Sequence, residues 1–600
     1  MGKAEKFYKH NINKAEKEIE SLNKNISLIG WFRLIIIILG LFLAYKFYNI
    51  DNFIYVLLTL LLTLFVFSMV AIFHGNKINK RDKLKTFIEI NEKGIKRLNG
   101  EYRQFEDKGK DLIEESHPFC EDLDIFGQNS LFQMINTTRT KVGRQLLGNI
   151  LSLKTLPSKN DILEKQEAIR ELGIEKIEWR QKLYVNATFK NKKEEDIDAL
   201  IKWCNDKKEV SKTPLIIAGI FMCITFVGIF LAILKVIPFS LLILDLMINF
   251  CVIKVLTKSM EDAIKLFHSV KYSIKSYSNI LSLIEDEEFK ANYLKKLQSK
   301  LKNNNVVSCK DEMKKLSSLM DWIGDSTSNA YYFIINVIAF ADVFIIYNLN
   351  NWKKKNGASV EEWINVMGEF DALSSIANIN FDHEEWCFSE ISDNKEVIGK
   401  NISHPLIGER AVGNDYELKS PKKISLITGS NMSGKSTFLR TVGINLVLTY
   451  IGAPVSAKSF KCGIMNIYTC MRTKDNLEES ISSFYAEILR IKLIIEACKK
   501  GENVFFLLDE IFKGTNSKDR HIGATVLVKQ LASNGAIGLL STHDLELCDL
   551  EEENNEITNF NFREYYEDNK IMFDYKLRKG KSQTQNAVYL MKLAGIDILQ

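Results

Sequence analysis

The 600-residue sequence contains few prolines, and its cysteines form no metal or disulfide pattern. The 10 cysteines are scattered from Cys120 to Cys548, without a C-x-x-C pair and without histidines at metal-ligand spacing. This distribution argues against a disulfide framework and a zinc site, and it is typical of buried thiols in a reducing compartment. The 7 prolines and the many Lys, Asn and Ile residues fit a mainly helical chain.

The chain also lacks a charge excess, an internal repeat and a low-complexity segment. Lys and Arg number 80 against 75 Asp and Glu, so net charge neither favours nor excludes nucleic acid as a partner. A chain of this length exceeds what one hydrophobic core supports, and we expect three or four structural units.

Two long apolar runs, residues 28–45 and 53–73, follow a charged helical segment over residues 1–26. The first run contains one charge, Arg33, close enough to its end to snorkel, and the second contains none. A signal peptide would have one shorter apolar core and a cleavage site. The runs therefore predict a transmembrane hairpin with a loop at residues 46–52.

A second apolar pair covers residues 215–234 and 236–253, with Lys235 and Pro238 at its turn. Lysines flank both pairs, which predicts about four spans with both chain ends in the cytoplasm. The alternative is a pair of buried core helices, and it is stronger for the second pair because that pair contains Asp245 and Asn249.

A third apolar run, residues 331–349, contains Asn336, Asp342 and Asn348 and has no partner run. A lone span would reverse the side of everything that follows, so we predict a buried helix, although a membrane span stays open. Residues 261–318 are charged and helical in pattern. Their apolar positions alternate steps of three and four, which fits a heptad seam or one helix packed on its neighbours: Leu266, Val270, Ile274, Tyr277, Leu281 and Ile284.

The most informative stretch is a glycine-bearing loop between an apolar strand, residues 424–427, and a helix-like segment, residues 437–448. Its G-x-x-x-x-G-K-[ST] spacing is that of a phosphate-binding loop, in which backbone N–H groups and the helix N-terminus hold a nucleotide. Lys435 would reach the β- and γ-phosphates, and the Ser436 hydroxyl would hold Mg²⁺. The candidate nucleotide-binding residues are Gly429, Ser430, Asn431, Met432, Ser433, Gly434, Lys435, Ser436 and Thr437.

Two further apolar strands in the C-terminal block end in polar residues. Residues 503–508 lead into Asp509 and Glu510, and residues 536–540 lead into Ser541, Thr542 and His543. Asp509 would hold the Mg²⁺ and Glu510 would polarise the attacking water, while His543 would contact the γ-phosphate. Alternation of such strands with helical stretches predicts an α/β domain with a mostly parallel sheet.

These motifs resemble the ATPase domain of the MutS family, within the ABC-type P-loop class. The similar segments are residues 403–406, 424–437 with the Asn431-Met432 dipeptide, 450–455, 482–487, 509–515 and 541–543, in the family's order over about 200 residues. The resemblance implies ATP and Mg²⁺ as cofactors. It also implies a head-to-tail homodimer, in which Ser482 of one subunit faces the γ-phosphate held by the other.

Weaker resemblance to the helical MutS core extends through residues 122–126, 130–132, 143–147, 167–170 and 368–373, so the second hairpin would be an insertion in that core. The chain also departs from the family. Residues 1–116 leave no room for a mismatch-reading domain, and the family's base-stacking aromatic falls at Ala411. Ser430 and Ser433 replace Pro and Gly, and we expect no helical dimerisation segment beyond Gln600.

The predicted fold is a C-terminal α/β P-loop ATPase domain after an all-α MutS core and lever region that carries two transmembrane hairpins. The predicted units are an N-terminal cytoplasmic helix (1–27), the first hairpin (28–74), a charged linker (75–116), a core-like region (117–205), the second hairpin (206–258), a lever region (259–385) and the ATPase domain (386–600).

The favoured function is a membrane-anchored MutS-like ATPase in which ATP drives dimer closure, with DNA as a candidate ligand and the lipid bilayer as a partner. Strict mismatch repair is disfavoured because the mismatch-reading domain is missing. One alternative is an ABC-type transporter, which four spans and the missing Leu-Ser-Gly-Gly-Gln signature disfavour. The other is a membrane scaffold whose ATPase switches a protein partner. Lysine-rich helices such as residues 290–302 fit DNA contact and a solvated surface equally well.

Overall fold

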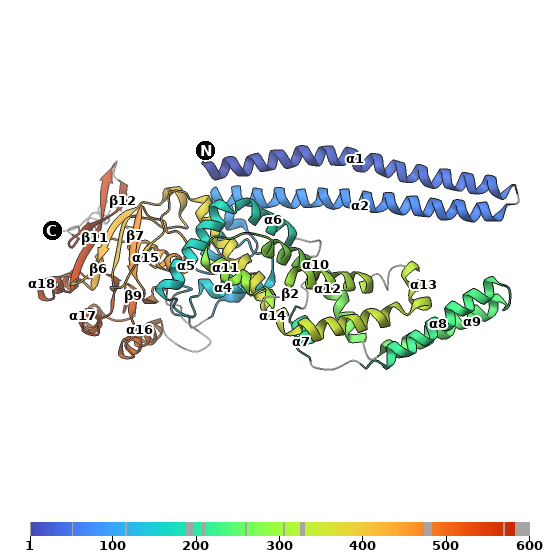
Figure 1. The fold of residues 1–600 in the computed structure, drawn as a ribbon. Helices are drawn as coiled ribbons and strands as arrows, with labels where there is room; N and C mark the ends of the chain where they lie inside the picture. The colour runs from blue at the N-terminus through green and yellow to red at the C-terminus, as the bar shows by residue number, and fades with distance from the viewer. Residues whose placement is uncertain are drawn as a thin grey trace.

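The computed structural model describes residues 2–50, 52–114, 117–187, 197–206, 211–258, 261–303, 307–324, 330–472, 483–567 and 570–582. These residues form two helical hairpins, a helical core and a C-terminal α/β domain (Figure 1). Both hairpins project from the helical core in the direction away from the α/β domain (Figure 1).

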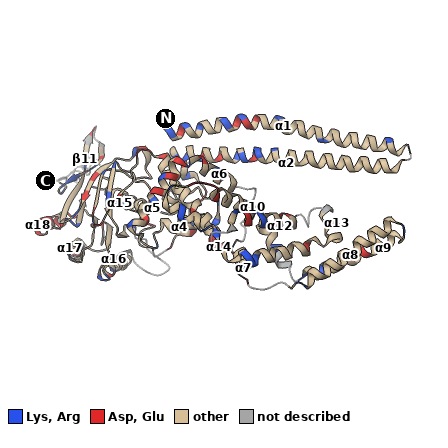
Figure 2. Cartoon of the chain, in the orientation of Figure 1, with Lys and Arg blue, Asp and Glu red and all other residues tan. Residues whose placement is uncertain are grey.

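The first hairpin consists of α1 (Lys3–Tyr48) and α2 (Phe53–Leu98). Each helix is continuous and has a charged half beside the helical core and an apolar outer half (Figure 2). Apolar side chains of the outer halves are exposed, for example Leu28 at 67% and Leu62 at 64%. Both helices are long and apolar enough to cross a membrane. The turn between them is shorter than the predicted loop because α1 continues to Tyr48.

The helical core follows α2 and is completed by helices on both sides of the second hairpin. Its elements are η1 (Glu101–Gln104), η2 (Lys110–Leu112), α3 (Leu131–Ile135), α4 (Lys141–Leu151), α5 (Lys159–Arg170), the π-helical turn η3 (Glu171–Glu175), α6 (Ile177–Ala187), α7 (Ile197–Asn205), α10 (Glu261–Glu285), α11 (Asn292–Ser299), β1 (Lys302–Asn303), β2 (Val307–Ser308) and α12 (Cys309–Gly324). The apolar seam of α10 is buried in this core, so α10 is one helix packed on its neighbours.

The second hairpin consists of α8 (Thr213–Ile233) and α9 (Phe239–Thr257), joined at Lys235, whose φ is +58°. Both helices are long and apolar enough to cross a membrane, which makes four such helices among the described residues. Their polar side chains turn inward, since Thr225 and Asn249 are fully buried while Ile233 is 72% exposed.

Most described apolar side chains of residues 331–349 are buried or half-buried, as predicted, but the prediction of one continuous helix is wrong. The segment is divided into α13 (Ala330–Ala339) and α14 (Ala341–Asp382), which meet at 81°. The break lies at Phe340, whose left-handed backbone (φ +54°) cannot continue either helix. Phe333 and Ile334 on α13 are more than half exposed, and Phe340 packs against the second hairpin. The bent pair would count as a fifth apolar span if it crossed a membrane as a unit.

The long helix α14 joins the second hairpin to the helical core. Near its C-terminal end, the buried carboxylate of Asp371 accepts hydrogen bonds from the backbone N–H groups of Arg139 (3.0 Å) and Thr140 (2.9 Å) at the start of α4. The last residue of α14, Asp382, is ion-paired with Arg97 of α2 in a buried contact. One helix thus contacts both hairpins.

The α/β domain contains two sheets. Five parallel strands and one antiparallel strand form the larger sheet, in the order β12-β11-β6-β10-β9-β8, and the smaller sheet has the order β3-β7-β4-β5. The strands are β3 (Glu390–Ser392), β4 (Val397–Ile402), β5 (Asn414–Leu418), β6 (Ile424–Thr428), β7 (Ser459–Gly463), β8 (Asn466–Cys470), β9 (Val504–Asp509), β10 (Ile537–Ser541), β11 (Ile557–Glu567) and β12 (Lys570–Lys579).

Helices of the α/β domain pack on the larger sheet. They are α15 (Lys435–Tyr450), α16 (Ser483–Lys499), α17 (Ser517–Ser533) and α18 (Leu550–Glu553), with the short turns η5 (Gly408–Arg410) and η6 (Glu546–Asp549). The predicted strands at residues 423–427, 503–508 and 536–540 are β6, β9 and β10, and these three strands are neighbours in the sheet. Their carboxyl ends therefore lie at one edge, which is where ligands bind in open α/β sheets.

Candidate functional site: a nucleotide site at the edge of the parallel sheet

The glycine-bearing loop joins β6 to α15. Three of its residues have a left-handed or similar positive φ: Gly429 (+150°), Met432 (+68°) and Gly434 (+108°). At Gly429 a side chain would also collide, because a Cβ there would lie 2.9 Å from the carbonyl oxygen of Phe562. This backbone turns the loop over the N-terminus of α15, where free N–H groups and the helix dipole attract an anion.

Glu510 and His543 follow β9 and β10, Lys435 opens α15 after the loop from β6, and the three side chains lie together. The Glu510 carboxylate is 2.8 Å from His543 Nε2 and 3.5 Å from Lys435 Nζ. Lys435 also donates to the carbonyl oxygen of Gly429 at 2.9 Å. The predicted catalytic residues therefore meet at one point of the sheet edge.

The surroundings lower the pKa of both Glu510 and Lys435. The hydrogen bond from His543 holds the pKa of the Glu510 carboxyl well below its ordinary value, against the opposing effect of burial. The Lys513 ammonium, 3.1 Å from the Glu510 carboxylate, also lowers the pKa of Glu510. Burial lowers the pKa of Lys435 from its ordinary value. Glu510 has a left-handed φ of +49°, a conformation that is costly for a residue with a side chain and is found most often at functional sites.

Asp509 and Ser436 are the residues that could hold a divalent cation. Asp509 ends β9 and is fixed by a hydrogen bond from the Ser541 hydroxyl of β10. Ser436 is the second residue of α15, beside the partly buried loop. A carboxylate and a hydroxyl are hard oxygen ligands of the kind that Mg²⁺ prefers, and Mg²⁺ is usually held by one or two such groups plus phosphate and water. The donor set fits Mg²⁺.

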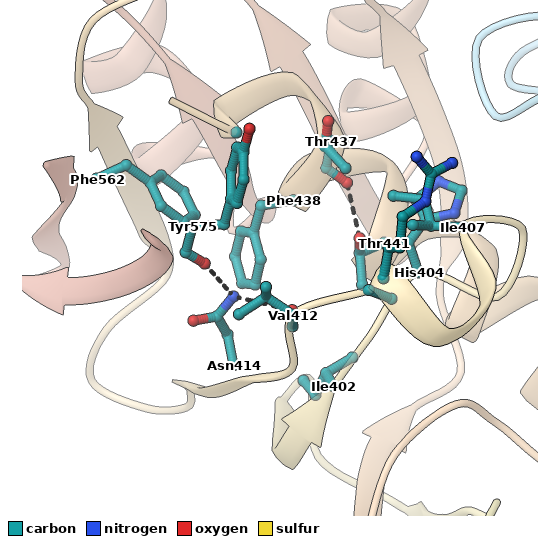
Figure 3. Close-up of a pocket in the computed structure, with 13 residues that line it drawn as sticks. Ile402, His404, Ile407, Val412, Asn414, Thr437, Phe438, Thr441, Phe562 and Tyr575 are labelled. Carbon is teal, nitrogen blue, oxygen red and sulfur yellow. Dashed lines mark hydrogen bonds between the residues drawn. The ribbon is translucent and has the colours of Figure 1, made fainter. Parts of the chain in front are cut away.

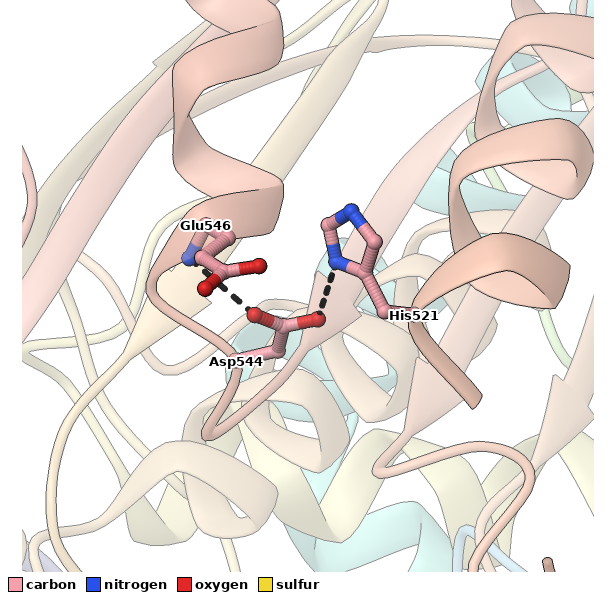
Figure 4. Close-up of side chains that lie close together, drawn as sticks. All are labelled: His521, Asp544 and Glu546. Atoms are coloured by element: carbon pink, nitrogen blue, oxygen red, sulfur yellow. Dashed lines mark hydrogen bonds and ion pairs between the residues drawn. The ribbon is translucent and has the colours of Figure 1, made fainter. Parts of the chain in front are cut away.

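A second polar group fixes the loop that carries His543. His521 of α17 lies 2.6 Å from the carboxylate of Asp544, the residue after His543, and Asp544 accepts a hydrogen bond of 3.0 Å from the backbone N–H of Glu546 (Figure 4). These contacts tie α17 to the end of β10, and we assign the group a structural role in placing His543.

A cavity of about 370 Å³ adjoins the phosphate loop on its other side. The rings of Phe438, Phe562 and Tyr575 line one side, and His404 and Ile407 line the other (Figure 3). The Tyr575 ring lies directly over the loop, because a Cβ on Gly434 would be 3.2 Å from it. Ala411, where the family's base-stacking aromatic was expected, also lines this cavity and offers only a methyl group.

Sequence reasoning missed Tyr575 and Glu564. Glu564 accepts a hydrogen bond of 2.8 Å from the Ser430 hydroxyl and is buried under the phosphate loop. Both residues belong to the β11–β12 pair, whose alternating apolar and polar pattern was the available signal.

Of the predicted residues, Ser482 lies outside the described part of the chain. The nearby Glu487 accepts a hydrogen bond of 2.7 Å from the Phe512 N–H, which joins α16 to the segment after Glu510.

Comparison with known proteins finds a matching family model in the C-terminal part of the chain. The family model of MutS domain V matches residues 425–598, which include the phosphate loop, Asp509, Glu510 and His543. The C-terminal part of this chain is thus similar to MutS domain V.

Curated MutS proteins are similar to the chain over the same part. The DNA mismatch repair protein MutS of Aquifex pyrophilus is 31% identical over 236 residues, which are 38% of this chain and 27% of that protein. Those of Persephonella marina and Thermotoga maritima are 32% and 30% identical over 235 and 249 residues, or 38% and 40% of this chain and 27% and 31% of theirs. The chain thus spans about a quarter to a third of the length of these relatives, and the matched part contains the candidate nucleotide site described above.

Proposed function

We propose that this chain is a membrane-anchored MutS-like ATPase that binds ATP with Mg²⁺ and hydrolyses it at the edge of the larger sheet. The convergence of Lys435, Glu510 and His543 on the phosphate loop is the observation that carries the proposal. Catalysis of phosphoryl transfer needs positioned positive charge, a metal ligand and a group that orients water. Lys435 supplies the charge, Asp509 the metal ligand and Glu510 the group that orients water.

In this proposal each residue has a separate task. Lys435 and the loop N–H groups bind the β- and γ-phosphates, and Ser436 and Asp509 hold the Mg²⁺, which would neutralise phosphate charge. Glu510 stays ionised through its hydrogen bond with His543 and orients the attacking water. His543 contacts the γ-phosphate. The aromatic side of the cavity, with Tyr575 over the loop, holds the adenine base.

The proposal includes a homodimer through the α/β domain, closed by ATP, in which Ser482 of one subunit approaches the γ-phosphate bound by the other. The exposed apolar side chains of this domain support the homodimer, because a second subunit would cover them. Met432 at the tip of the phosphate loop is 85% exposed, and Ile522 and Val526 on α17 are more than half exposed. A concentration-dependent rise in specific ATPase activity, with dimers detected only in the presence of ATP, is the expected result.

The proposal places the two hairpins in a membrane and the α/β domain in the cytoplasm. Four helices have the length and composition of membrane spans, and their apolar surfaces are exposed to the surroundings. Lysines gather on the core side of the hairpins, as cytoplasmic flanks do (Figure 2). Resistance of the chain to alkaline carbonate extraction from cell membranes tests this placement, and release into the soluble fraction would contradict it.

The proposal also includes DNA as the ligand on which the closed dimer acts. Its support is the similarity to DNA mismatch repair proteins and the exposed lysines on and directly after α11, such as Lys295 and Lys300. Affinity for duplex or branched DNA should fall steeply with salt, and Lys295→Glu with Lys300→Glu should lower both the affinity and the salt dependence. If ATPase activity responds to a protein partner and not to any DNA, the scaffold function replaces this part of the proposal.

The enzymatic test compares Mg²⁺-dependent ATP hydrolysis by the purified full chain with that of Lys435→Ala and Glu510→Gln. We expect Glu510→Gln to lower the rate by about 10²–10⁴-fold while ATP binding persists, and Lys435→Ala to abolish both. Lys529→Ala, which removes an exposed lysine paired with Glu553, is the matched control and should leave the rate unchanged. Equal rates in all variants would exclude the proposed ATPase.

A further inference from the structure

A groove between α9 and α13 is lined by apolar side chains. Its volume is about 380 Å³, within the range of about 300–1,000 Å³ that is typical of ligand pockets. The Cys251 thiol is the most polar group in its walls, and a free thiol behaves as a small apolar side chain. The walls include Ile243, Met247 and Phe250 of α9 and Phe333, Ile334 and Val337 of α13. The part of a ligand that lies in this groove must therefore be apolar.

A buried hydrogen bond and an aromatic contact fix α13 against α9. The amide of the fully buried Asn249 donates at 3.1 Å to the backbone carbonyl of Val337, in the last turn of α13. The ring centroids of Phe250 and Phe333 are 5.7 Å apart. The two walls of the groove therefore have a defined relative position.

The groove opens toward the surroundings of the second hairpin. Met247 on one wall and Phe333 and Ile334 on the other are more than half exposed. Exposed apolar surface of this kind is normally covered by a partner or a membrane. Since α9 is long and apolar enough to cross a membrane, lipids of the bilayer could enter the groove from the side.

Positive charge lies at one end of the groove. Lys254 is in the last turn of α9, and its ammonium lies 4.8 Å from the centroid of the Phe250 ring, while Lys258 follows one turn later. Both lysines are exposed, and neither forms an ion pair with a carboxylate among the side chains that the structure describes. Asp245 of α9 accepts a hydrogen bond from Thr225 of α8 and does not line the groove. Because an ammonium has three N–H donors and the ring face lies on one side of it, Lys254 can also bind an anion.

We propose that the groove binds an acyl chain of an anionic glycerophospholipid of the bilayer, with the headgroup phosphate held by Lys254 and Lys258. The site has the two parts that such a lipid needs, an apolar channel and cations at the end that leads to the helical core. The inference goes beyond the proposed ATPase and rests on the proposed membrane placement, which puts that end of α9 at the cytoplasmic surface. A lipid bound there contacts both α9 and α13, and α13 meets the long helix α14 at Phe340.

A second copy of the chain fits the groove less well than an anionic lipid. A two-fold axis along the membrane normal would bring the same face of both copies together at the same depth. The lysines at the end of α9 would then lie close to those of the other copy, and like charges repel each other. An anionic lipid supplies the negative charge that the described residues do not provide.

Photolabelling in vesicles tests the preference for an anionic headgroup. The full chain is reconstituted in phosphatidylcholine vesicles that contain a trace of phosphatidylglycerol with a diazirine in one acyl chain, or the same amount of phosphatidylcholine with that chain. Light releases N₂ from the diazirine, and the resulting carbene inserts into a nearby C–H bond of the protein. We expect the phosphatidylglycerol probe to label peptides of α9 and α13 at least about fivefold more than the phosphatidylcholine probe, because each lysine near the surface contributes about that factor.

Four variants test the two parts of the site. Lys254→Gln should lower labelling by the phosphatidylglycerol probe about fivefold and leave labelling by the phosphatidylcholine probe unchanged. Lys254→Arg keeps the charge and should keep the preference. Met247→Trp fills the groove and should lower the labelling of α13 by both probes. Lys235→Gln removes a lysine at the opposite end of the hairpin, in the turn between α8 and α9, and is the matched control that should be labelled like the wild type.

Each contrary result has a distinct meaning. Equal labelling of the wild type by both probes would show that the groove selects no headgroup, and an unchanged preference in Lys254→Gln would exclude the assigned phosphate contact. Labelling of the apolar half of α1 without labelling of α9 and α13 would show that protein, such as a second copy, covers the groove. Absence of label from all helices, together with release of the chain by alkaline carbonate, would contradict the membrane placement and with it the lipid site. Any of these results would overturn the proposal, and only the last would also overturn the proposed membrane anchoring.

Discussion

The Tyr102 hydroxyl donates a hydrogen bond of 3.0 Å to the backbone carbonyl of Leu406. Tyr102 is buried in η1, directly after α2, the second helix of the first hairpin. Leu406 lies between His404 and Ile407, which form a wall of the cavity beside the phosphate loop. The first hairpin and the nucleotide site are therefore connected by one short chain of contacts.

Removing this hydroxyl should weaken nucleotide binding. In Tyr102→Phe the ring still fills its place, but the Leu406 carbonyl keeps only the longer hydrogen bond from Arg103, at 3.3 Å. The lost bond is worth about 1 kcal/mol, so we expect the affinity for a fluorescent ATP analogue to fall up to about fivefold with little change in kcat. Tyr293→Phe, which removes a hydroxyl bonded to Glu369 in the helical core, is the control and should bind nucleotide normally.

The buried ion pair between Arg97 and Asp382 should hold the first hairpin to α14. Their side chains are 6% and 1% exposed, and Asp382 also accepts a hydrogen bond of 2.8 Å from Tyr8. Asp382→Asn leaves a buried guanidinium without its counter-charge, which typically costs about 3–5 kcal/mol. We expect a lower midpoint of thermal unfolding and faster protease cleavage between α2 and η1. Glu384→Gln removes only the exposed pair with Lys3, and a similar loss in that variant would refute the assignment.

Much of the fold follows from local sequence patterns, and its exceptions come from contacts between distant segments. The apolar runs predict helices because a segment that spans a membrane must satisfy its backbone hydrogen bonds within itself. The break at Phe340 could not be predicted, since a left-handed phenylalanine is unfavourable locally. It is stabilised by packing against Ala218 and Ile253 of the second hairpin, far away in the sequence. The smaller sheet was missed because its strands are short and pair out of chain order.

In the candidate nucleotide site, too, local sequence patterns predict some residues and contacts between distant segments place the others. Gly429, Lys435 and Ser436 have fixed spacing within one loop, and Asp509 and His543 lie at or just after the end of an apolar strand, so the sequence alone predicts that they lie together. Tyr575 belongs to no motif and follows no apolar strand end. It reaches the cavity only because β12 pairs with β11 and β11 pairs with β6, and the sequence alone does not predict which strands pair.

His543 should control the pH dependence of ATP hydrolysis through Glu510. Its hydrogen bond keeps the pKa of Glu510 far below the ordinary 4.5, so Glu510 stays ionised on the acidic side and its titration should not appear in the wild-type profile. In His543→Ala this pKa rises toward 4.5, and activity should fall as the pH drops through that value. We also expect a rate about 10²–10³-fold lower at neutral pH. A wild-type profile with a carboxyl step near 4.5 would argue against this coupling.

Buried His404 should make the α/β domain sensitive to mild acid. Its Nδ1 accepts a hydrogen bond of 3.2 Å from the Leu406 N–H, and burial lowers the pKa of His404 from 6.5 to about 4. The unfolded chain binds the proton more tightly, so the stabilisation is complete above pH 6.5 and is lost as the pH falls toward 4. At pH 5 the loss is about 2 kcal/mol. Thermal unfolding should show a larger drop between pH 7 and pH 5 in the wild type than in His404→Asn, whose amide oxygen takes the place of Nδ1 and accepts the same bond without titrating.

Tyr575 should replace the missing aromatic at Ala411 in holding the base. Its ring lies over Gly434, and its backbone carbonyl accepts a hydrogen bond of 3.0 Å from the Asn414 amide, which fixes the residue at the cavity. Stacking of a base on an aromatic ring is worth about 1–3 kcal/mol. Tyr575→Ala should therefore weaken binding of a fluorescent ATP analogue by about 5–150-fold, while Tyr575→Phe retains the ring and the affinity. Tyr565→Ala, a similarly exposed tyrosine on β11, should bind normally, and a loss of affinity in Tyr575→Phe equal to that in Tyr575→Ala would show that the hydroxyl, not the ring face, recognises the nucleotide.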